Sequence, residues 1–303
     1  MLKLKSILFF TGVLMTNSSE RLIYSLLATF SLSLSIFFKK QILSMDKPAI
    51  ELIIQFMIIA ALVLSFNLFL FQRKYIVKIK YFKQNEILAI LLASILLLAA
   101  YLFTTFGLDY TTSINYSFLS RSSLIFTSML AFFLLKEQMY FGKIVLIICF
   151  FVGIYLITTG GKIITPQIGD MLILVGSFFL SYTSIVQKKL HKNLPPELIC
   201  WGVITSGAIL CIFASFFLNV NVFNFNNLAI IFLVGLTEAL IILFMNKAIR
   251  VANVTYYTMM NMLVPVINGI MGIMLLNESI NLIQIVGGVI LLISGILVQK
   301  LRA

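Results

Sequence analysis

Long apolar segments constrain the fold of this chain more than any other feature. Ten of them approach or exceed the length of about 20 residues that an α-helix needs to cross a bilayer. They occupy residues 22–43, 50–71, 85–107, 112–135, 142–160, 169–190, 197–219, 228–249, 254–276 and 281–301. Each is apolar throughout, without the alternation typical of barrel strands. The sequence therefore predicts an all-α integral membrane protein with ten transmembrane helices.

Composition agrees with lipid as the solvent of this chain. The 303 residues are 61% hydrophobic and only 11% charged, whereas a soluble domain carries about 25% charged residues. In a soluble protein the net charge of +12 would suggest nucleic acid. Here the cations lie between apolar segments, so we expect the lipid bilayer as a partner and no nucleic acid.

Residues suited to catalysis or metal binding are scarce. The three cysteines (Cys149, Cys200 and Cys211) lie inside apolar segments without metal-ligand spacing, and the only histidine is His191. We interpret these cysteines as small buried hydrophobes. The chain has no HExxH, GxSxG or GxxxxGK motif. We therefore expect no catalytic residues, no metal site and no cofactor, and ATP is not the direct energy source.

Positive charges predict the orientation in the membrane. The chain has 22 lysines and arginines, of which Arg121 lies within a span. If the amino terminus lies inside, the cations on the outer side are Lys39, Lys40, Lys47 and Lys162, and all the others lie on the inner side. Because cations concentrate on the cytoplasmic side, we expect both termini to be cytoplasmic in a cell (inner) membrane.

The first apolar block, residues 6–15, is too short to span. The stretch "MTNSSERLIYS" from Met15 resembles a natural amino terminus. We therefore expect the first 14 residues to be dispensable and residues 1–20 to form an amino-terminal extension.

An internal repeat divides the rest of the chain. A shift of 141 positions places residues 102–157 on 243–298 without a gap, so that "LLKE" ending at Glu137 meets "LLNE" ending at Glu278. The predicted repeats are residues 21–161 and 168–302, each with five spans. Because five is odd, the second repeat enters the membrane inverted, as in many secondary transporters.

These repeated segments also resemble a known family. "LLKEQMYFGKIVLIICFFVGIYLITTG", "LLNESINLIQIVGGVILLISGILVQK" and "NKAIRVANVTYYTMMNMLVPVINGIMGIMLLNE" resemble the EamA domain of the drug/metabolite transporter superfamily, in two copies. The resemblance implies ten helices in inverted halves and a central substrate cavity lined mainly by spans 3, 4, 8 and 9. It does not imply a substrate, because members move amino acids, sugars, nucleotide-linked metabolites and drugs.

Two ionisable residues lie deep in predicted spans, Arg121 in the fourth and Glu238 in the eighth. A charge at that depth costs at least about 2.5–3.5 kcal/mol and so requires a reason. Their repeat counterparts are Met262 and Leu97, so the architecture does not require either charge. The guanidinium fork of Arg121 suits a carboxylate or phosphate. Glu238 is expected to be its counter-charge in the empty site, or to receive an ammonium group or a coupling proton. A permanent structural ion pair is the alternative.

Other polar residues in the fourth and ninth spans follow helical spacings. As further substrate-binding candidates we take Tyr116, Ser117, Ser120, Tyr257, Asn261 and Asn268. The alternative for the serines is helix packing. Pro265 is expected to weaken the ninth span and to aid bending. Glu137 and Glu278, at opposite membrane faces, either start the following helices or gate the two mouths.

These features predict a secondary active transporter that moves a small polar, anionic or zwitterionic metabolite, such as an amino acid, by alternating access. A proton or counter-substrate gradient is expected to drive it. The alternatives are an exporter of drugs or toxic metabolites, a non-transporting membrane subunit, and an enzyme acting on lipid-linked substrates. The enzyme would need clustered carboxylates or a His/Ser set, which the sequence lacks.

Overall fold

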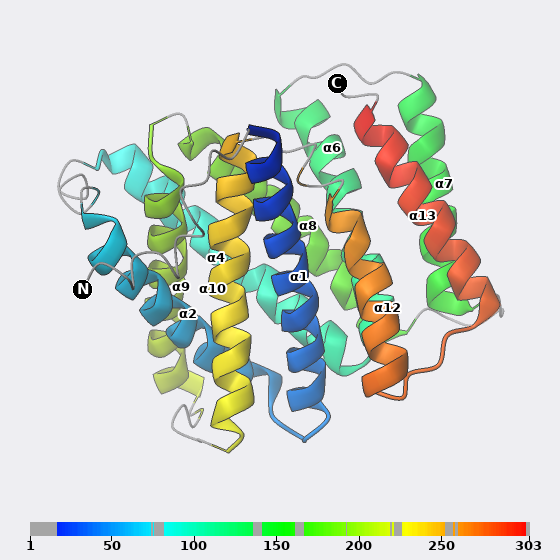
Figure 1. Cartoon of the computed structure of the whole chain (residues 1–303), viewed down its shortest axis with the longest axis horizontal. Helices are drawn as coiled ribbons and strands as arrows, with labels where there is room; N and C mark the ends of the chain where they lie inside the picture. The colour runs from blue at the N-terminus through cyan, green and yellow to red at the C-terminus, as the bar shows by residue number, and fades with distance from the viewer. Residues whose placement is uncertain are drawn as a thin grey trace.

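The structure is a computed structural model that describes residues 17–73, 75, 82–135, 141–160, 167–191, 193–218, 220, 226–251, 257 and 260–300. The regular elements within these residues are helical (Figure 1). In chain order they are α1 (Asn17–Leu43), α2 (Ala49–Phe71), α4 (Gln84–Asp109), α5 (Ser113–Leu119), α6 (Ser122–Leu135), α7 (Phe141–Thr159), α8 (Ile168–Leu190), α9 (Pro196–Leu218), α10 (Leu228–Val251), the 3-10 turn η1 (Asn261–Leu263), α12 (Val264–Leu275) and α13 (Leu282–Lys300).

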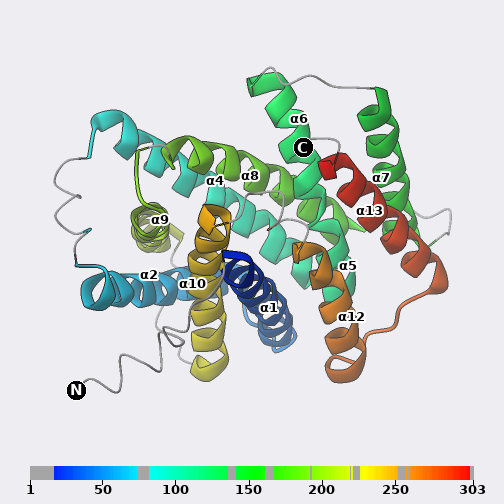
Figure 2. The ribbon, with the colours of Figure 1, turned by 45° about the horizontal axis from the view of Figure 1, so that its top comes forward.

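The main helix contacts join the first half of the chain to the second. Helix α1 packs along α10, α4 along α8, α2 along α9 and α7 along α13. Figures 1 and 2 show α1 beside α10 and α7 beside α13 in both views. A shift of 141 positions makes the α1–α10 contact the counterpart of the α8–α4 contact. Each of these helices of the first half therefore packs against a helix of the second half.

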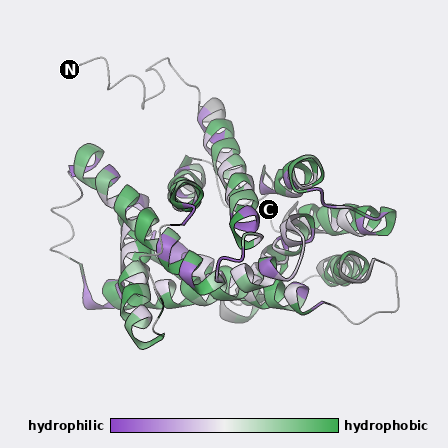
Figure 3. Ribbon diagram, turned by 90° about the horizontal axis from the view of Figure 1, so that it is seen from below, coloured by the Kyte–Doolittle hydropathy of each residue, from purple (hydrophilic) through white to green (hydrophobic). Residues whose placement is uncertain are grey.

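Six helices are long and apolar enough to cross a membrane by length and composition: α1, α2, α4, α8, α9 and α10. Shorter apolar helices lie in α7, in η1 with α12, and in α13, so the number of ten crossings stays a prediction. Hydrophobic residues make up most of the helices in Figure 3. Large apolar side chains also lie on the surface, where Phe216 is 76% and Met274 73% exposed. Such a surface suits lipid, and the chain is a multi-pass membrane protein.

Glycines permit the close approach of α7 to α13 and of α8 to α4. A Cβ atom on Gly153 would lie 2.8 Å from the carbonyl oxygen of Gly287. A Cβ atom on Gly176 would lie 2.5 Å from Cγ2 of Thr104. The absence of a side chain at these positions lets the helix backbones come close, as is common in membrane bundles.

The predicted fourth span, residues 112–135, is not one continuous helix, so that part of the prediction is wrong. The turn at Ser120 and Arg121 separates α5 from α6. Within this turn the backbone N–H of Arg121 donates to the carbonyl oxygen of Phe118 at 3.0 Å. Hydrogen bonds between residues three apart tighten the backbone relative to a regular α-helix.

The predicted ninth span is irregular at the equivalent position. The 3-10 turn at Asn261–Leu263 precedes α12, and the shift of 141 places Ser120 on Asn261. Both halves therefore interrupt the regular helix at the same level of the repeat. Discontinuous helices at the middle of a bundle are where many transporters bind their substrate.

Candidate functional site

Arg121 lies at the break between α5 and α6 and is 7% exposed. Its Nη1 atom donates to the carbonyl oxygen of Asn261 at 3.3 Å, and its Nη2 atom donates to the hydroxyl oxygen of Ser120 at 3.1 Å. The Nε atom has no hydrogen-bond partner among the residues that the structure describes. A buried donor without a partner costs about 1–3 kcal/mol. The guanidinium therefore holds an unused donor at a buried position.

Residues from both halves surround this guanidinium. Tyr116 and Tyr257 both lie near Arg121, and the side chain of Tyr257 forms a hydrogen bond with that of Asn261. The two tyrosines occupy equivalent repeat positions. From α1, the hydroxyl of Thr29 lies 3.0 Å from Oδ1 of Asn261. We call Arg121, Ser120, Asn261, Tyr116 and Tyr257 the Arg121 centre. It joins α5 to the start of the ninth span, and Thr29 of α1 contacts it through Asn261.

Three other predicted residues have different surroundings. The hydroxyl of Ser117 donates to the carbonyl oxygen of Ile114 at 2.7 Å, as the packing interpretation predicts. Asn268 is 1% exposed, and neither amide atom has a partner within the described residues. Pro265 lies in the first turn of α12, where its missing N–H breaks no helical hydrogen bond. The irregular backbone of this span lies before Pro265, in η1.

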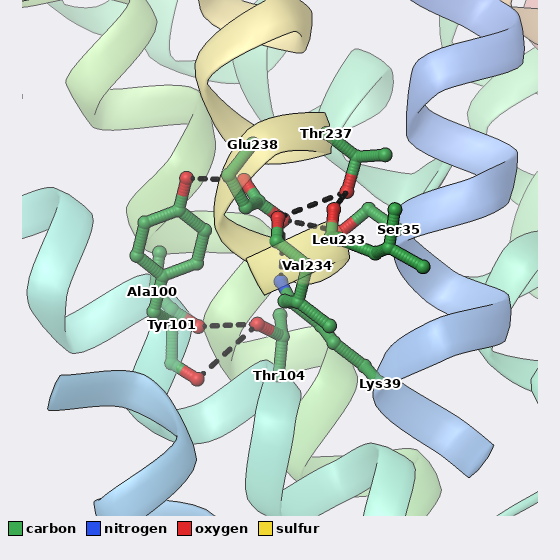
Figure 4. Close-up of polar contacts among 9 residues, drawn as sticks. All are labelled: Ser35, Lys39, Ala100, Tyr101, Thr104, Leu233, Val234, Thr237 and Glu238. Atoms are coloured by element: carbon green, nitrogen blue, oxygen red, sulfur yellow. Dashed lines mark hydrogen bonds and ion pairs between the residues drawn. The ribbon is translucent and has the colours of Figure 1, made fainter. Parts of the chain in front are cut away.

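Glu238 pairs with Lys39 and not with Arg121. Its Oε1 atom lies 2.6 Å from Nζ of Lys39 and accepts from the hydroxyl of Ser35 at 2.6 Å, while Oε2 accepts from the hydroxyl of Tyr101 at 2.7 Å (Figure 4). No carboxylate in the described part of the chain lies within ion-pair distance of Arg121. The expectation that Glu238 is the counter-charge of Arg121 is therefore wrong.

Lys39 is the residue that the sequence analysis missed, because it was assigned to the outer side together with Lys40. The structure places Lys39 inside α1 with 4% exposure. Its Nζ atom lies 4.5 Å from the ring centroid of Phe56 and 4.9 Å from that of Tyr101. The available signal was its position within the predicted span 22–43, where a cation needs a partner. That partner is 199 positions away in the chain.

The two charged centres are separate, although both rest on α1. Thr29 contacts the Arg121 centre, whereas Ser35 contacts Glu238. The six positions between Thr29 and Ser35 correspond to about 9 Å along a helix that rises 1.5 Å per residue. The expectation that Glu238 receives the ammonium group of a substrate bound at Arg121 stays a prediction.

Glu278 caps a helix of the opposite half. Its Oε1 atom accepts from the backbone N–H of Ser113 at 2.7 Å, and its Oε2 atom accepts from the Ser113 hydroxyl at 2.8 Å and from the backbone N–H of Ile114 at 3.1 Å. The two N–H groups belong to the first turn of α5 and have no acceptor within that helix, and a carboxylate is favoured at such a position. A Cβ atom on Gly272 would lie 2.7 Å from this Oε2 atom.

The expectation that Glu278 starts the helix that follows it is therefore wrong. At the start of α13 the side-chain oxygen of Asn281 accepts from the backbone N–H of Ile283 at 3.4 Å. Glu137, the repeat counterpart of Glu278, lies outside the described residues. The gating role of both glutamates stays a prediction.

Comparison with known proteins adds a family and a fold. Residues 21–159 and 167–299 each match the EamA-like transporter family. The uncharacterized transporter YyaM of Bacillus subtilis (strain 168) is 26% identical over 202 residues, which is 63% of this chain and 65% of YyaM. The matched region thus spans slightly less than two thirds of that relative. A crystal structure of 12% identity has a TM-score of 0.58 and covers 91% of this chain and 99% of its own, which shows a shared fold. Because the family match extends over both halves, the chain belongs to the EamA-like transporter family.

Proposed function

We propose that this protein is a secondary active transporter and that the Arg121 centre binds the anionic group of a small anionic or zwitterionic metabolite. The observation that carries the proposal is the buried guanidinium of Arg121, whose Nε atom has no partner among the described residues. The family and the relative named as a transporter support transport in general. The discontinuous helix at Ser120 and Arg121 supports the location of the site.

The present partners of Arg121 suit an exchange with substrate. Two of its nitrogens donate to neutral acceptors, the carbonyl of Asn261 and the hydroxyl of Ser120. An ionised oxygen adds charge attraction that these neutral acceptors lack, and a carboxylate or phosphate can accept two parallel hydrogen bonds from the guanidinium fork. A carboxylate or phosphate therefore competes well for these donors. Asn268, seven positions after Asn261, adds a buried amide whose polar atoms have no partner among the described residues.

Alternating access completes the proposal. The two halves rock against each other around the Arg121 centre, and a proton or counter-substrate gradient supplies the energy. The distribution of positive charge supports a cell (inner) membrane location with both termini in the cytoplasm. The lipid bilayer and the small-molecule substrate are the partners.

Uptake into proteoliposomes tests this function. The probe is a set of radiolabelled amino acids, organic acids and phosphorylated sugars, offered to the unmodified chain and to Arg121→Met, Arg121→Lys and Arg73→Met variants. Arg73 is an exposed arginine near the end of α2 and serves as the matched control. We expect Arg121→Met to abolish uptake and Arg73→Met to leave it unchanged. Arg121→Lys keeps the charge but loses the planar fork, so the apparent KM should rise about tenfold. Undiminished uptake of the anionic substrate by Arg121→Met would contradict the proposal.

A further inference from the structure

A second polar centre surrounds the ammonium group of Lys39 and shares no residue with the Arg121 centre. We call its lining residues, Ser35, Phe56, Tyr101 and Glu238, the Lys39 pocket. The ammonium lies 2.6 Å from Oε1 of Glu238, which also accepts from the hydroxyl of Ser35 (Figure 4). The aromatic rings of Phe56 and Tyr101 lie 4.5 Å and 4.9 Å from Nζ, measured to the ring centroids. A carboxylate next to two aromatic rings is a combination that recognises ammonium groups by charge and by cation–π attraction.

The walls of this pocket are held by packing. Ser35 comes from α1, Phe56 from α2, Tyr101 from α4 and Glu238 from α10. Phe56 is fully buried, and its ring meets that of Tyr101 edge to face at 5.2 Å between centroids. The hydroxyl of Tyr101 also donates to Glu238 at 2.7 Å. By contrast, Lys39 enters the pocket on a flexible four-carbon stem.

The fold does not require this ion pair. The α4–α8 contact is the counterpart of the α1–α10 contact, and there Leu97, with 4% exposure, takes the place of Glu238. The same shift of 141 positions places the apolar Leu180 at the position of Lys39. Buried ion pairs are commonly no more stable than apolar packing of the same volume. The same architecture therefore forms with and without the charges.

Acceptors for a lysine ammonium also occur at this end of the bundle. The adjacent Lys40 donates from Nζ to the carbonyl oxygens of Leu108 and Asp109, at 3.0 Å and 3.3 Å. These carbonyls belong to the last turn of α4, and unpaired carbonyls at a helix end attract lysine. An ammonium that leaves Glu238 at this level therefore has polar groups within the same region.

We propose that this pocket is a binding site for a primary alkylammonium group, and that Lys39 is a tethered occupant which a free ammonium ligand replaces. The replacing group must be a cation because Glu238 is 4% exposed and would otherwise be left as an uncompensated buried charge. A narrow alkyl chain fits where the Lys39 stem now lies. A proton alone would leave the rings of Phe56 and Tyr101 without a cation. The inference goes beyond the anion site and does not depend on Arg121.

The first test uses n-propylammonium, which is the part of the side chain that Lys39→Ala removes. The purified full chain is unfolded thermally with this cation or with neutral 1-propanol. We expect n-propylammonium, at a concentration well above its dissociation constant, to raise the Tm of Lys39→Ala by about 5 °C. The matched control Lys40→Ala and the Lys39→Ala/Glu238→Gln double variant should not respond, and 1-propanol should have no effect. An equal response of Lys39→Ala and Lys40→Ala would overturn the proposal.

The second test uses the unmodified chain and keeps the proposal falsifiable if Lys39→Ala fails to fold. An amine-acylating reagent is applied with and without n-butylammonium, and labelling of Lys39 and Lys40 is measured by mass spectrometry. We expect the cation to raise Lys39 labelling severalfold while Lys40 labelling stays constant. Glu238→Gln should label at Lys39 without any added cation. Unchanged Lys39 labelling at saturating n-butylammonium would show that Lys39 cannot be displaced and would overturn the proposal. Both readouts are independent of uptake, so failure of the Arg121 proposal leaves them interpretable.

Discussion

At the scale of single residues, the two buried cations of this bundle are held in opposite ways. Lys39 lies against a carboxylate and two aromatic rings, whereas the acceptors of Arg121 among the described residues are neutral. Removal of one partner from a buried ion pair leaves an uncompensated charge, which typically costs about 3–5 kcal/mol. Removal of a cation that has no anionic partner leaves no such charge behind. The two cations therefore have different expected effects on stability.

This contrast gives a prediction for the free energy of unfolding. Glu238→Gln should lose about 3 kcal/mol, because Lys39 then lacks its anionic partner. Arg121→Met should change stability by about 1 kcal/mol or less, because no carboxylate among the described residues pairs with Arg121. The Lys39→Met/Glu238→Leu double variant should recover most of the loss. Reversible denaturation in detergent measures all three variants. A double variant as unstable as Glu238→Gln would show that the interaction is not a simple ion pair.

At the scale of elements, helices of opposite halves approach closely at glycines, and the carboxylate of Glu278 joins the two halves by hydrogen bonds to the start of α5. Gly287 in α13 has no space for a side chain, since a Cβ atom would lie 2.7 Å from Cβ of Leu156 and 2.9 Å from the carbonyl oxygen of Gly153. Gly269 in α12 has nothing within 4 Å of the same position. The two glycines share a helical conformation and differ in what surrounds them.

We therefore predict opposite effects of the same substitution at these two glycines. Gly269→Ala should be neutral or should stabilise by about 0.5–1 kcal/mol, because alanine is the better helix former. Gly287→Ala should destabilise by about 1–3 kcal/mol, since α7 and α13 must move apart to relieve the overpacking. Thermal unfolding of both variants in detergent checks this pair. Equal effects would mean that α7 and α13 do not meet at Gly287.

The carboxylate of Glu278 gives a second prediction at this scale. Glu278→Gln removes the charge that caps α5 and should cost about 1 kcal/mol, whereas Ser279→Ala in the same exposed segment should cost nothing measurable. If Glu278 only caps α5, uptake by Glu278→Gln should stay close to that of the unmodified chain. A shift of the balance between inward and outward accessibility, measured by thiol labelling at both ends, would instead support the gating role.

At the scale of the whole molecule, the sequence was informative wherever a property repeats along one segment. Long apolar segments predicted the helices, and the shift of 141 positions placed Ser120 and Asn261 at equivalent points. The sequence did not predict the turn at Ser120 and Arg121, because neither residue forbids a helix and the tightened backbone depends on tertiary contacts. It also did not predict the partner of Glu238. An ion pair between residues 199 positions apart leaves no local pattern.

Orientation is also a property of the whole molecule, and the charge distribution predicts it without reference to any single contact. The segment between α2 and α4 and both ends of the chain should face the cytoplasm, whereas the segment between α12 and α13 should face outward. The exposed Gln84 is the first residue of α4 and borders the first of these segments, and the exposed Ser279 lies in the second. The test introduces Gln84→Cys or Ser279→Cys after Cys149, Cys200 and Cys211 are replaced by alanine.

A membrane-impermeant thiol reagent applied to intact cells should label Ser279→Cys and leave Gln84→Cys unlabelled. Both variants should be labelled after the cells are opened, which controls for burial of the new thiol. The reverse pattern in intact cells would invert the orientation and would place Lys39 and Lys40 at the cytoplasmic end of α1. Labelling of both positions in intact cells would be incompatible with an odd number of crossings between them. The spans predict an odd number of crossings from Gln84 to Ser279, which places the two thiols on opposite sides of the membrane. The same experiment therefore tests both the orientation and whether the number of crossings is odd.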